Sequence, residues 1–162
     1  EFRAQIEAVL NAGLHPTHLD WHCLNNGGRP DIFELSVVLA KEYGLALRVS
    51  DSRLTAKLQT EGLPAAEFEL LNSFAFDIEA KAARYAEILY NLPAGLSEWA
   101  VHPGLDNDQA RTTDPAGWPV RASDYSFLMS PQAKQIIQQE EIILVSYSPL
   151  QAQWQSQLSK RE

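Results

Sequence analysis

Two short strand-like runs flank a helical pattern near the start of the chain, and this arrangement limits the possible folds more than any other feature. Residues 17–22 and 45–49 have the character of strands, and the segment between them carries apolar residues at helical spacing. Pro30 suits the first position of that helix, and Gly44 suits its end. Such short connections predict a βαβ unit with parallel strands and a right-handed crossover.

The first of these strands places three chemically active side chains on one face. Successive strand residues point to opposite faces. One face would carry Thr17, Leu19 and Trp21, and the other His18, Asp20 and His22. Histidine and aspartate bind metals and transfer protons. A single histidine more often forms hydrogen bonds inside a polar core, so both interpretations stay open for each one.

The rest of the chain alternates between helical and strand-like patterns. A polar segment without periodicity, from Asp106 to Pro119, is predicted to be a loop. The other predicted elements are a helix from Phe2 that Gly13 ends, a loop with a short helix from Asp51 to Pro64, a short strand at Phe74–Phe76, a helix from Glu79 to Tyr90 with Ala83, Ala86 and Leu89 inward, a strand from Ser97 to His102, a helix that Ser130 caps and Pro131 begins, a buried strand from Ile142 to Tyr147, and a polar terminal helix from Gln151 to Lys160.

Composition predicts one globular domain over residues 1–162. The chain is 45% hydrophobic, which is enough for a sizeable core, and its net charge of -8 argues against nucleic acid or an anionic membrane as a partner. It contains no apolar run long enough to span a membrane. The single cysteine, Cys23, excludes an internal disulfide and favours a cytoplasmic location. The opening residues are already helical in pattern and lack an initiator methionine, so we expect the chain to start within a longer protein.

Three segments together resemble one known family. The stretch from Gly13 to Val49 contains a Pro-Thr-His-Leu-Asp-x-His core, an Arg-Pro-Asp helix start and the ending Glu-Tyr-Gly-x-x-x-Arg. It resembles the YdjC-like carbohydrate deacetylases, which include chitooligosaccharide and hopanoid-associated deacetylases. Residues 98–104, which end in His-Pro-Gly, and residues 121–150, which include Asp124, fit the same pattern.

The resemblance implies an α/β fold, a distorted (β/α) barrel with mostly parallel strands. A complete barrel of this kind takes about 250 residues, whereas the patterns here predict four or five strands. We therefore expect a partial barrel that lacks one or more N-terminal β/α units. The strand at residues 17–22 would then present an open edge, and open edges pair with other chains. We therefore expect either self-association through this edge or another cover for it.

In barrels of this kind the active site lies at the carboxyl ends of the strands, where His22, Arg48 and His102 would lie. The resemblance implies that His22 is a metal ligand, with zinc or magnesium as the metal. It implies that the family's other ligands, an aspartate and a second histidine, lie upstream of this chain. His102 matches the His-Pro-Gly segment, so it is the candidate catalytic residue, as a general acid or oxyanion stabiliser. The alternative is a histidine that fixes the turn before Pro103.

Three further residues are expected to support the metal ligand or bind substrate. Asp20 would orient His18 or His22 by accepting a hydrogen bond. Arg48 would hold a sugar hydroxyl or orient a carboxylate, with an ion pair to Asp20 as the alternative. Trp118 would stack on a sugar ring or, alternatively, clamp its own segment.

These expectations combine into one function and one alternative. The resemblance implies a metal-dependent carbohydrate deacetylase that, in the full-length parent, removes N-acetyl groups from an amino sugar, an oligosaccharide or a glycolipid. The fragment alone is expected to be inactive. The alternative is a catalytically incomplete fragment, or a divergent homologue with a sugar-binding or assembly role.

Overall fold

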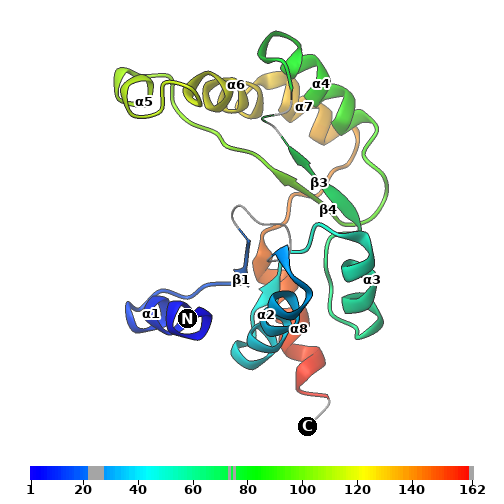
Figure 1. The fold of residues 1–162 in the computed structure, drawn as a ribbon. Coiled ribbons are helices and arrows are strands. Elements are labelled where there is room, and N and C mark those ends of the chain that lie inside the picture. The colour runs from blue at the N-terminus through cyan, green and yellow to red at the C-terminus, as the bar shows by residue number, and fades with distance from the viewer. Residues whose placement is uncertain (22–27, 73, 75, 161–162) are drawn as a thin grey trace. The chain divides into compact units, whose positions relative to one another are not determined.

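The structure of the chain is a computed structural model that describes residues 1–21, 28–72, 74 and 76–160 (Figure 1). Its contacts divide the chain into two compact units. The first unit contains residues 1–69 and 145–162, and the second contains residues 70–144. The expectation of a single domain over residues 1–162 stays a prediction.

The predicted βαβ unit is present in the first unit. Strand β1 (His18–Leu19) pairs in parallel with β2 (Ala46–Leu47), with His18 opposite Ala46 and Leu19 opposite Leu47. Helix α2 (Pro30–Tyr43) connects the two strands and packs against both. Both strands are shorter than the runs at residues 17–22 and 45–49 that were expected to form them. The parallel pairing itself confirms the prediction.

The ends of α2 follow from three residues. Pro30 occupies the first turn, where its missing N–H is not needed, and Asp31 places a negative charge near the positive end of the helix dipole. Gly44 ends the helix in the left-handed conformation, with φ of 63°. These residues confirm the predicted boundaries of this helix.

A hydrophobic core forms where α2 and β2 meet two other helices, α3 (Ser52–Thr60) and α8 (Tyr147–Leu158). Trp154 of α8 is fully buried, and its indole N–H donates a hydrogen bond of 2.8 Å to the Pro64 carbonyl. The terminal helix thus begins earlier than expected and has a buried face. The buried members of this core are Phe33, Val37, Ala40, Ala46, Leu47, Val49, Leu58, Leu63, Ala65 and Trp154.

Helix α1 (Phe2–Asn11) packs on the same βαβ unit through a smaller cluster. Ile6 is buried against Leu39 and Leu45. An exposed ion pair between Arg3 and Glu42 joins α1 to α2. The helix ends before Gly13, as the sequence predicts, and Gly13 has a positive φ of 77°.

Three helices build the core of the second unit. They are α4 (Ile78–Tyr90), α6 (Trp118–Leu128) and α7 (Pro131–Gln139), and they pack against one another (Figure 1). Ser130 caps α7, as predicted, because its hydroxyl accepts a hydrogen bond of 3.1 Å from the Ala133 N–H. The buried members of this core are Tyr85, Ala86, Leu89, Phe127, Ala133 and Ile136.

Two strands accompany these helices. Strand β3 (Phe68–Asn72) pairs with β4 (Ser97–Ala100), which confirms the strand predicted from residue 97. The predicted strand at residues 74–76 lies partly outside the described residues, because residue 75 is not described; Phe74 and Phe76 themselves are not in a strand. The prediction of an unstructured loop from residue 106 to 119 is wrong. Asn107 caps a short helix there, α5 (Asp108–Thr113), and α6 begins at residue 118.

The segment before α8 contradicts the expectation of a final buried strand at residues 142–147. Residues 142–146 lie in neither a helix nor a strand, and the side chain of Ile143 is 83% exposed. Leu144 and Val145 are exposed as well. Ser146 caps α8, which begins at Tyr147. The last residue of the predicted strand is therefore the first residue of a helix. Residues with a high strand propensity form a strand only when a neighbouring strand pairs with them. None of the described strands pairs with this segment.

The fold is therefore α/β, with four strands and eight helices among the described residues. The strands form two sheets of two strands each within the part of the chain that the structure describes.

Candidate functional site

His18 lies on β1 between two side chains that fix its ring. Tyr147, the first residue of α8, stacks on the imidazole with ring centroids 3.7 Å apart and an angle of 10° between the ring planes. The Thr17 hydroxyl lies 3.0 Å from Nδ1 of the ring. The residue that precedes the strand thus engages one ring nitrogen, and the stack holds the plane of the ring.

The surroundings of His18 favour its neutral form. Partial burial lowers the pKa of the imidazole below its usual value of 6.5, and the positive charge of Arg48 lowers it further. The carboxylate of Asp20 acts in the opposite direction but does not outweigh the burial. A neutral imidazole is the form that accepts protons and binds metals.

Asp20 and Arg48 form an ion pair beside this histidine. Nη1 of Arg48 donates to both carboxylate oxygens of Asp20, at 2.8 Å and 2.7 Å. The Arg48 side chain is 17% exposed and that of Asp20 is 36% exposed, so the pair is only partly desolvated. The structure thus has the ion pair that the sequence analysis gave as the alternative role of Arg48. Their roles toward a substrate or a metal ligand stay predictions.

The predicted metal ligand, His22, lies outside the described residues, and so does Cys23. Among the residues that the structure describes, no group of three histidine, cysteine, aspartate or glutamate side chains could hold a metal ion. The donors described here therefore do not by themselves fit a catalytic metal, which needs about three protein ligands.

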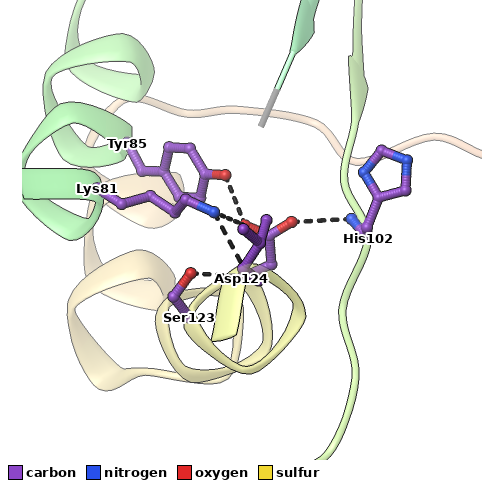
Figure 2. A network of polar contacts seen from close by, with 6 residues as sticks. Lys81, Tyr85, His102, Ser123 and Asp124 are labelled. Atoms are coloured by element: carbon purple, nitrogen blue, oxygen red, sulfur yellow. Dashed lines mark hydrogen bonds and ion pairs between the residues drawn. The ribbon is translucent and has the colours of Figure 1, made fainter. Parts of the chain in front are cut away.

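The second unit contains a buried polar network centred on Asp124 of α6 (Figure 2). Its Oδ1 accepts hydrogen bonds from Nζ of Lys81, at 2.9 Å, and from the hydroxyl of Tyr85, at 2.6 Å. Its Oδ2 accepts a hydrogen bond of 2.9 Å from the backbone N–H of His102. Lys81, Tyr85 and Asp124 are each at most 1% exposed.

The candidate catalytic residue, His102, is the second residue after the end of β4. Figure 2 shows its backbone nitrogen facing Asp124, with the imidazole directed away from the carboxylate. The ring meets the edge of Phe74, with centroids 4.7 Å apart and an interplanar angle of 79°. Phe74 is 44% exposed. An imidazole that is partly exposed beside an aromatic ring can exchange a proton with a bound molecule.

Sequence reasoning did not assign a role to this network. In α4, Ala86 and Leu89 are buried as predicted, but Ala83 is exposed and Lys81 is buried in its place. Lysine is almost never fully buried without a partner, so its burial was not expected from the pattern. The available signal was the spacing of Lys81 and Tyr85, which are four residues apart and therefore share one helix face.

Trp118 has neighbours within its own segment. The guanidinium of Arg111 lies 4.9 Å from the centroid of the Trp118 ring, and Arg111 also forms an ion pair with Asp106. These contacts agree with the alternative in which the tryptophan clamps its own segment.

The chain is similar to a known protein family, to curated proteins and to a solved structure. The model of the family described as YdjC-like protein matches residues 1–139. Three proteins named carbohydrate deacetylase, from three strains of Listeria monocytogenes, are each 28% identical to the chain over 151 residues. The matched region covers 93% of this chain but 58% of each relative. The chain therefore spans little more than half the length of the curated relatives that it matches.

A solved structure supports the same fold. A protein from Enterococcus faecalis, described as a proposed cellobiose-phosphate cleavage protein, superimposes with a TM-score of 0.70 at 22% identity. The match covers 93% of this chain and 59% of the other. At this identity the likeness concerns the fold alone.

The lowered pKa of His18 makes the free energy of unfolding depend on pH. The unfolded chain binds a proton at His18 near the usual pKa of 6.5, whereas the folded chain resists it until a lower pH. The stabilisation is therefore fully present above about pH 6.5 and is lost as the pH falls toward the folded pKa. Urea unfolding between pH 5 and 8 should show a smaller decline in the free energy of unfolding for His18→Gln than for the native chain. The same substitution at exposed His15 is the control, and equal declines for all three proteins would contradict the prediction.

Proposed function

Because the chain belongs to the YdjC-like protein family, we propose that it is part of a carbohydrate deacetylase that removes N-acetyl groups from an amino sugar, an oligosaccharide or a glycolipid. The family match over residues 1–139 carries the proposal, and the name of the Listeria relatives supports it. The activity is proposed for the full-length parent, because the chain covers 58% of the length of those relatives.

His102 is the proposed catalytic residue. Its backbone is anchored to a buried carboxylate, and its ring meets an exposed aromatic side chain, Phe74. A histidine in this setting can donate a proton to the leaving amine or stabilise the oxyanion of the tetrahedral intermediate. A positioned general acid accelerates such reactions by about 10² to 10⁴.

His18, Asp20 and Arg48 are proposed to bind substrate or to orient a ligand. The ion pair keeps the Arg48 guanidinium in place beside Asp20. A guanidinium is a donor group that suits the hydroxyl groups of a sugar. The stack with Tyr147 fixes the plane of His18, which lets the ring offer a hydrogen bond in a defined direction.

A divalent metal, zinc or magnesium, is part of the proposal, with His22 as a ligand. Such a metal polarises an acyl carbonyl and lowers the pKa of a bound water. The described residues alone do not supply the three ligands that a catalytic metal needs. The remaining ligands would come from the parent protein, as the family resemblance implies.

The proposed setting of the site is a partial, distorted (β/α) barrel. The TM-score of 0.70 over 59% of the Enterococcus protein supports a likeness to part of a larger fold. The parallel pairing of β1 with β2 is the arrangement of neighbouring strands in such a barrel.

A cytoplasmic location is also proposed, on the ground that one cysteine suits a reducing compartment. Within the described ranges, no helix is both long enough and apolar enough to cross a membrane.

A role in sugar binding or assembly without catalysis is the second candidate. The chain as given spans 58% of its relatives, and its described residues do not complete a metal site. The fragment alone is therefore expected to release no acetate. Acetate release by the fragment would favour catalysis by this part of the parent alone.

Metal content tests the role of His22. Elemental analysis of the gently purified full-length parent should give nearly one equivalent of metal, and His22→Ala in that protein should lose it, because a histidine ligand contributes directly to affinity. His15→Ala, which removes an exposed histidine of the same chain, should keep the metal. Equal metal in both variants, or none in the native parent, would contradict His22 as a metal ligand.

Deacetylation by the full-length parent tests the function itself. The metal-loaded protein should release acetate from di-N-acetylchitobiose, and His102→Ala should lower kcat by about 10² to 10⁴, because the proton donor is lost. His15→Ala is again the control and should keep kcat. If the native protein releases no acetate from this or other N-acetylated sugars, the proposed function is wrong.

Self-association through the open edge of the β1 sheet is the remaining proposal. Among the described strands, β1 pairs only with β2. The other edge of β1 could therefore pair with a strand of a second chain. Sedimentation velocity over a range of concentrations should therefore show a dimer or a larger species. A monomer at every concentration would refute this proposal.

A further inference from the structure

The segment that carries His102 is tied to α6 at two points. The N–H of His102 donates to Oδ2 of Asp124 at 2.9 Å, and the N–H of Gly104 donates to the carbonyl of Arg121 at 3.0 Å. The two acceptors lie three residues apart on α6, and therefore about one helical turn apart. The backbone on both sides of Pro103 is thus held against one helix.

Gly104 allows this close approach. A Cβ atom at this position would lie 3.1 Å from Cβ of Arg121, which is closer than most side-chain contacts. The absence of a side chain therefore lets the segment reach the helix. His102, two residues earlier, is placed by the same approach.

The direction of Asp124 is set from the other side. Two donors from α4, Lys81 and Tyr85, hold its Oδ1, and Nζ of Lys81 also lies 3.4 Å from the carbonyl of Val120 (Figure 2). With one oxygen held by two donors, the second oxygen has little freedom and is aimed at the N–H of His102.

Stability alone does not account for this arrangement. Burying a lysine and an aspartate costs desolvation energy, and apolar residues of similar volume are often as stable or more stable. The charged pair does something that an apolar pair would not: it offers a fixed acceptor to the backbone of His102. The ring of His102, whose backbone is fixed, then rests against Phe74.

We propose that Asp124, held by Lys81 and Tyr85, is a positioning residue that fixes the backbone amide of His102 and thereby the place of its imidazole. This inference rests on the proposed function, in which His102 transfers a proton at the acyl group of a sugar. Asp124 itself does not touch the substrate. Its loss should therefore lower kcat and leave KM unchanged, because the site still binds the sugar but presents the imidazole out of place.

Asp124→Asn is the first variant, studied in the metal-loaded full-length parent. The cation of Lys81 will hold the amide oxygen toward α4, so the NH₂ group will face the His102 N–H, where two donors cannot bond. Leu89→Ala is the matched control. It removes a buried side chain from α4, in the same core, and leaves every hydrogen bond of the network in place.

The first measurement is hydrogen exchange at the His102 amide, together with the chemical shifts of its imidazole. Asp124→Asn should speed exchange at this amide at least tenfold more than at other amides of the unit and should shift the ring resonances. Leu89→Ala should show no such selective change. Unchanged protection at His102 in Asp124→Asn would overturn the proposal, whether or not the protein is an enzyme.

The second measurement is acetate release from di-N-acetylchitobiose. Asp124→Asn should lower kcat ten- to a hundredfold with the same KM, and Leu89→Ala should keep kcat at temperatures where it is folded. Unchanged kcat in Asp124→Asn, with an active native protein, would overturn the proposal. If the native protein is inactive while the exchange result holds, the proposed function fails and the positioning of His102 by Asp124 stands.

A second variant covers the case in which Asp124→Asn does not fold. The triple substitution Lys81→Met, Tyr85→Phe and Asp124→Leu replaces the network with apolar groups of similar shape, which is compatible with folding. It should be folded, show fast exchange at His102 and have the same low kcat. A folded triple variant with native exchange and native kcat would overturn the proposal.

Discussion

The ion pair between Lys81 and Asp124 is the interaction around which α4, α6 and the segment after β4 are arranged. Both side chains are removed from water, at 1% and 0% exposure, and an isolated buried charge of this kind would be very costly. The cost is offset because other groups complete the hydrogen bonding, namely the hydroxyl of Tyr85 and the amide of His102. Helices α4 and α6 and the segment after β4 therefore meet at one carboxylate, and none of them can shift without leaving a charged group unsatisfied.

The first unit could be predicted largely from its sequence, because its signals are local. Pro30 and Gly44 mark the ends of α2 by their backbone geometry alone, and the two strand-like runs at its flanks pair as expected. The segment at residues 142–146 could not be predicted in this way. Its apolar residues have high strand propensity, but a strand needs a partner, and whether one lies beside it is not encoded in the segment itself.

Only the part of the candidate site that depends on local patterns could be predicted from the sequence. The sequence left open an ion pair between Asp20 and Arg48, and the structure has this pair. The Asp20 carboxylate also acts on the pKa of His18. The network around Asp124 was not predicted, because it joins residues 43 positions apart in the chain. Lysine is rarely buried, so the sequence of α4 does not predict the burial of Lys81. The packing of α4 against α6 explains it, because this packing brings Asp124 to the lysine.

Each unit also contains an indole in a distinctive environment. Trp154 is fully buried in the first unit, where its N–H is bonded to a carbonyl. Trp99, in the second unit, packs edge-on against Tyr85, and its shielded indole nitrogen has no hydrogen-bond partner in the described part of the chain. Indole emission depends on solvent contact and hydrogen bonding. With Trp21 and Trp118 replaced by phenylalanine, the fluorescence of the two remaining tryptophans becomes an optical signal from each unit separately.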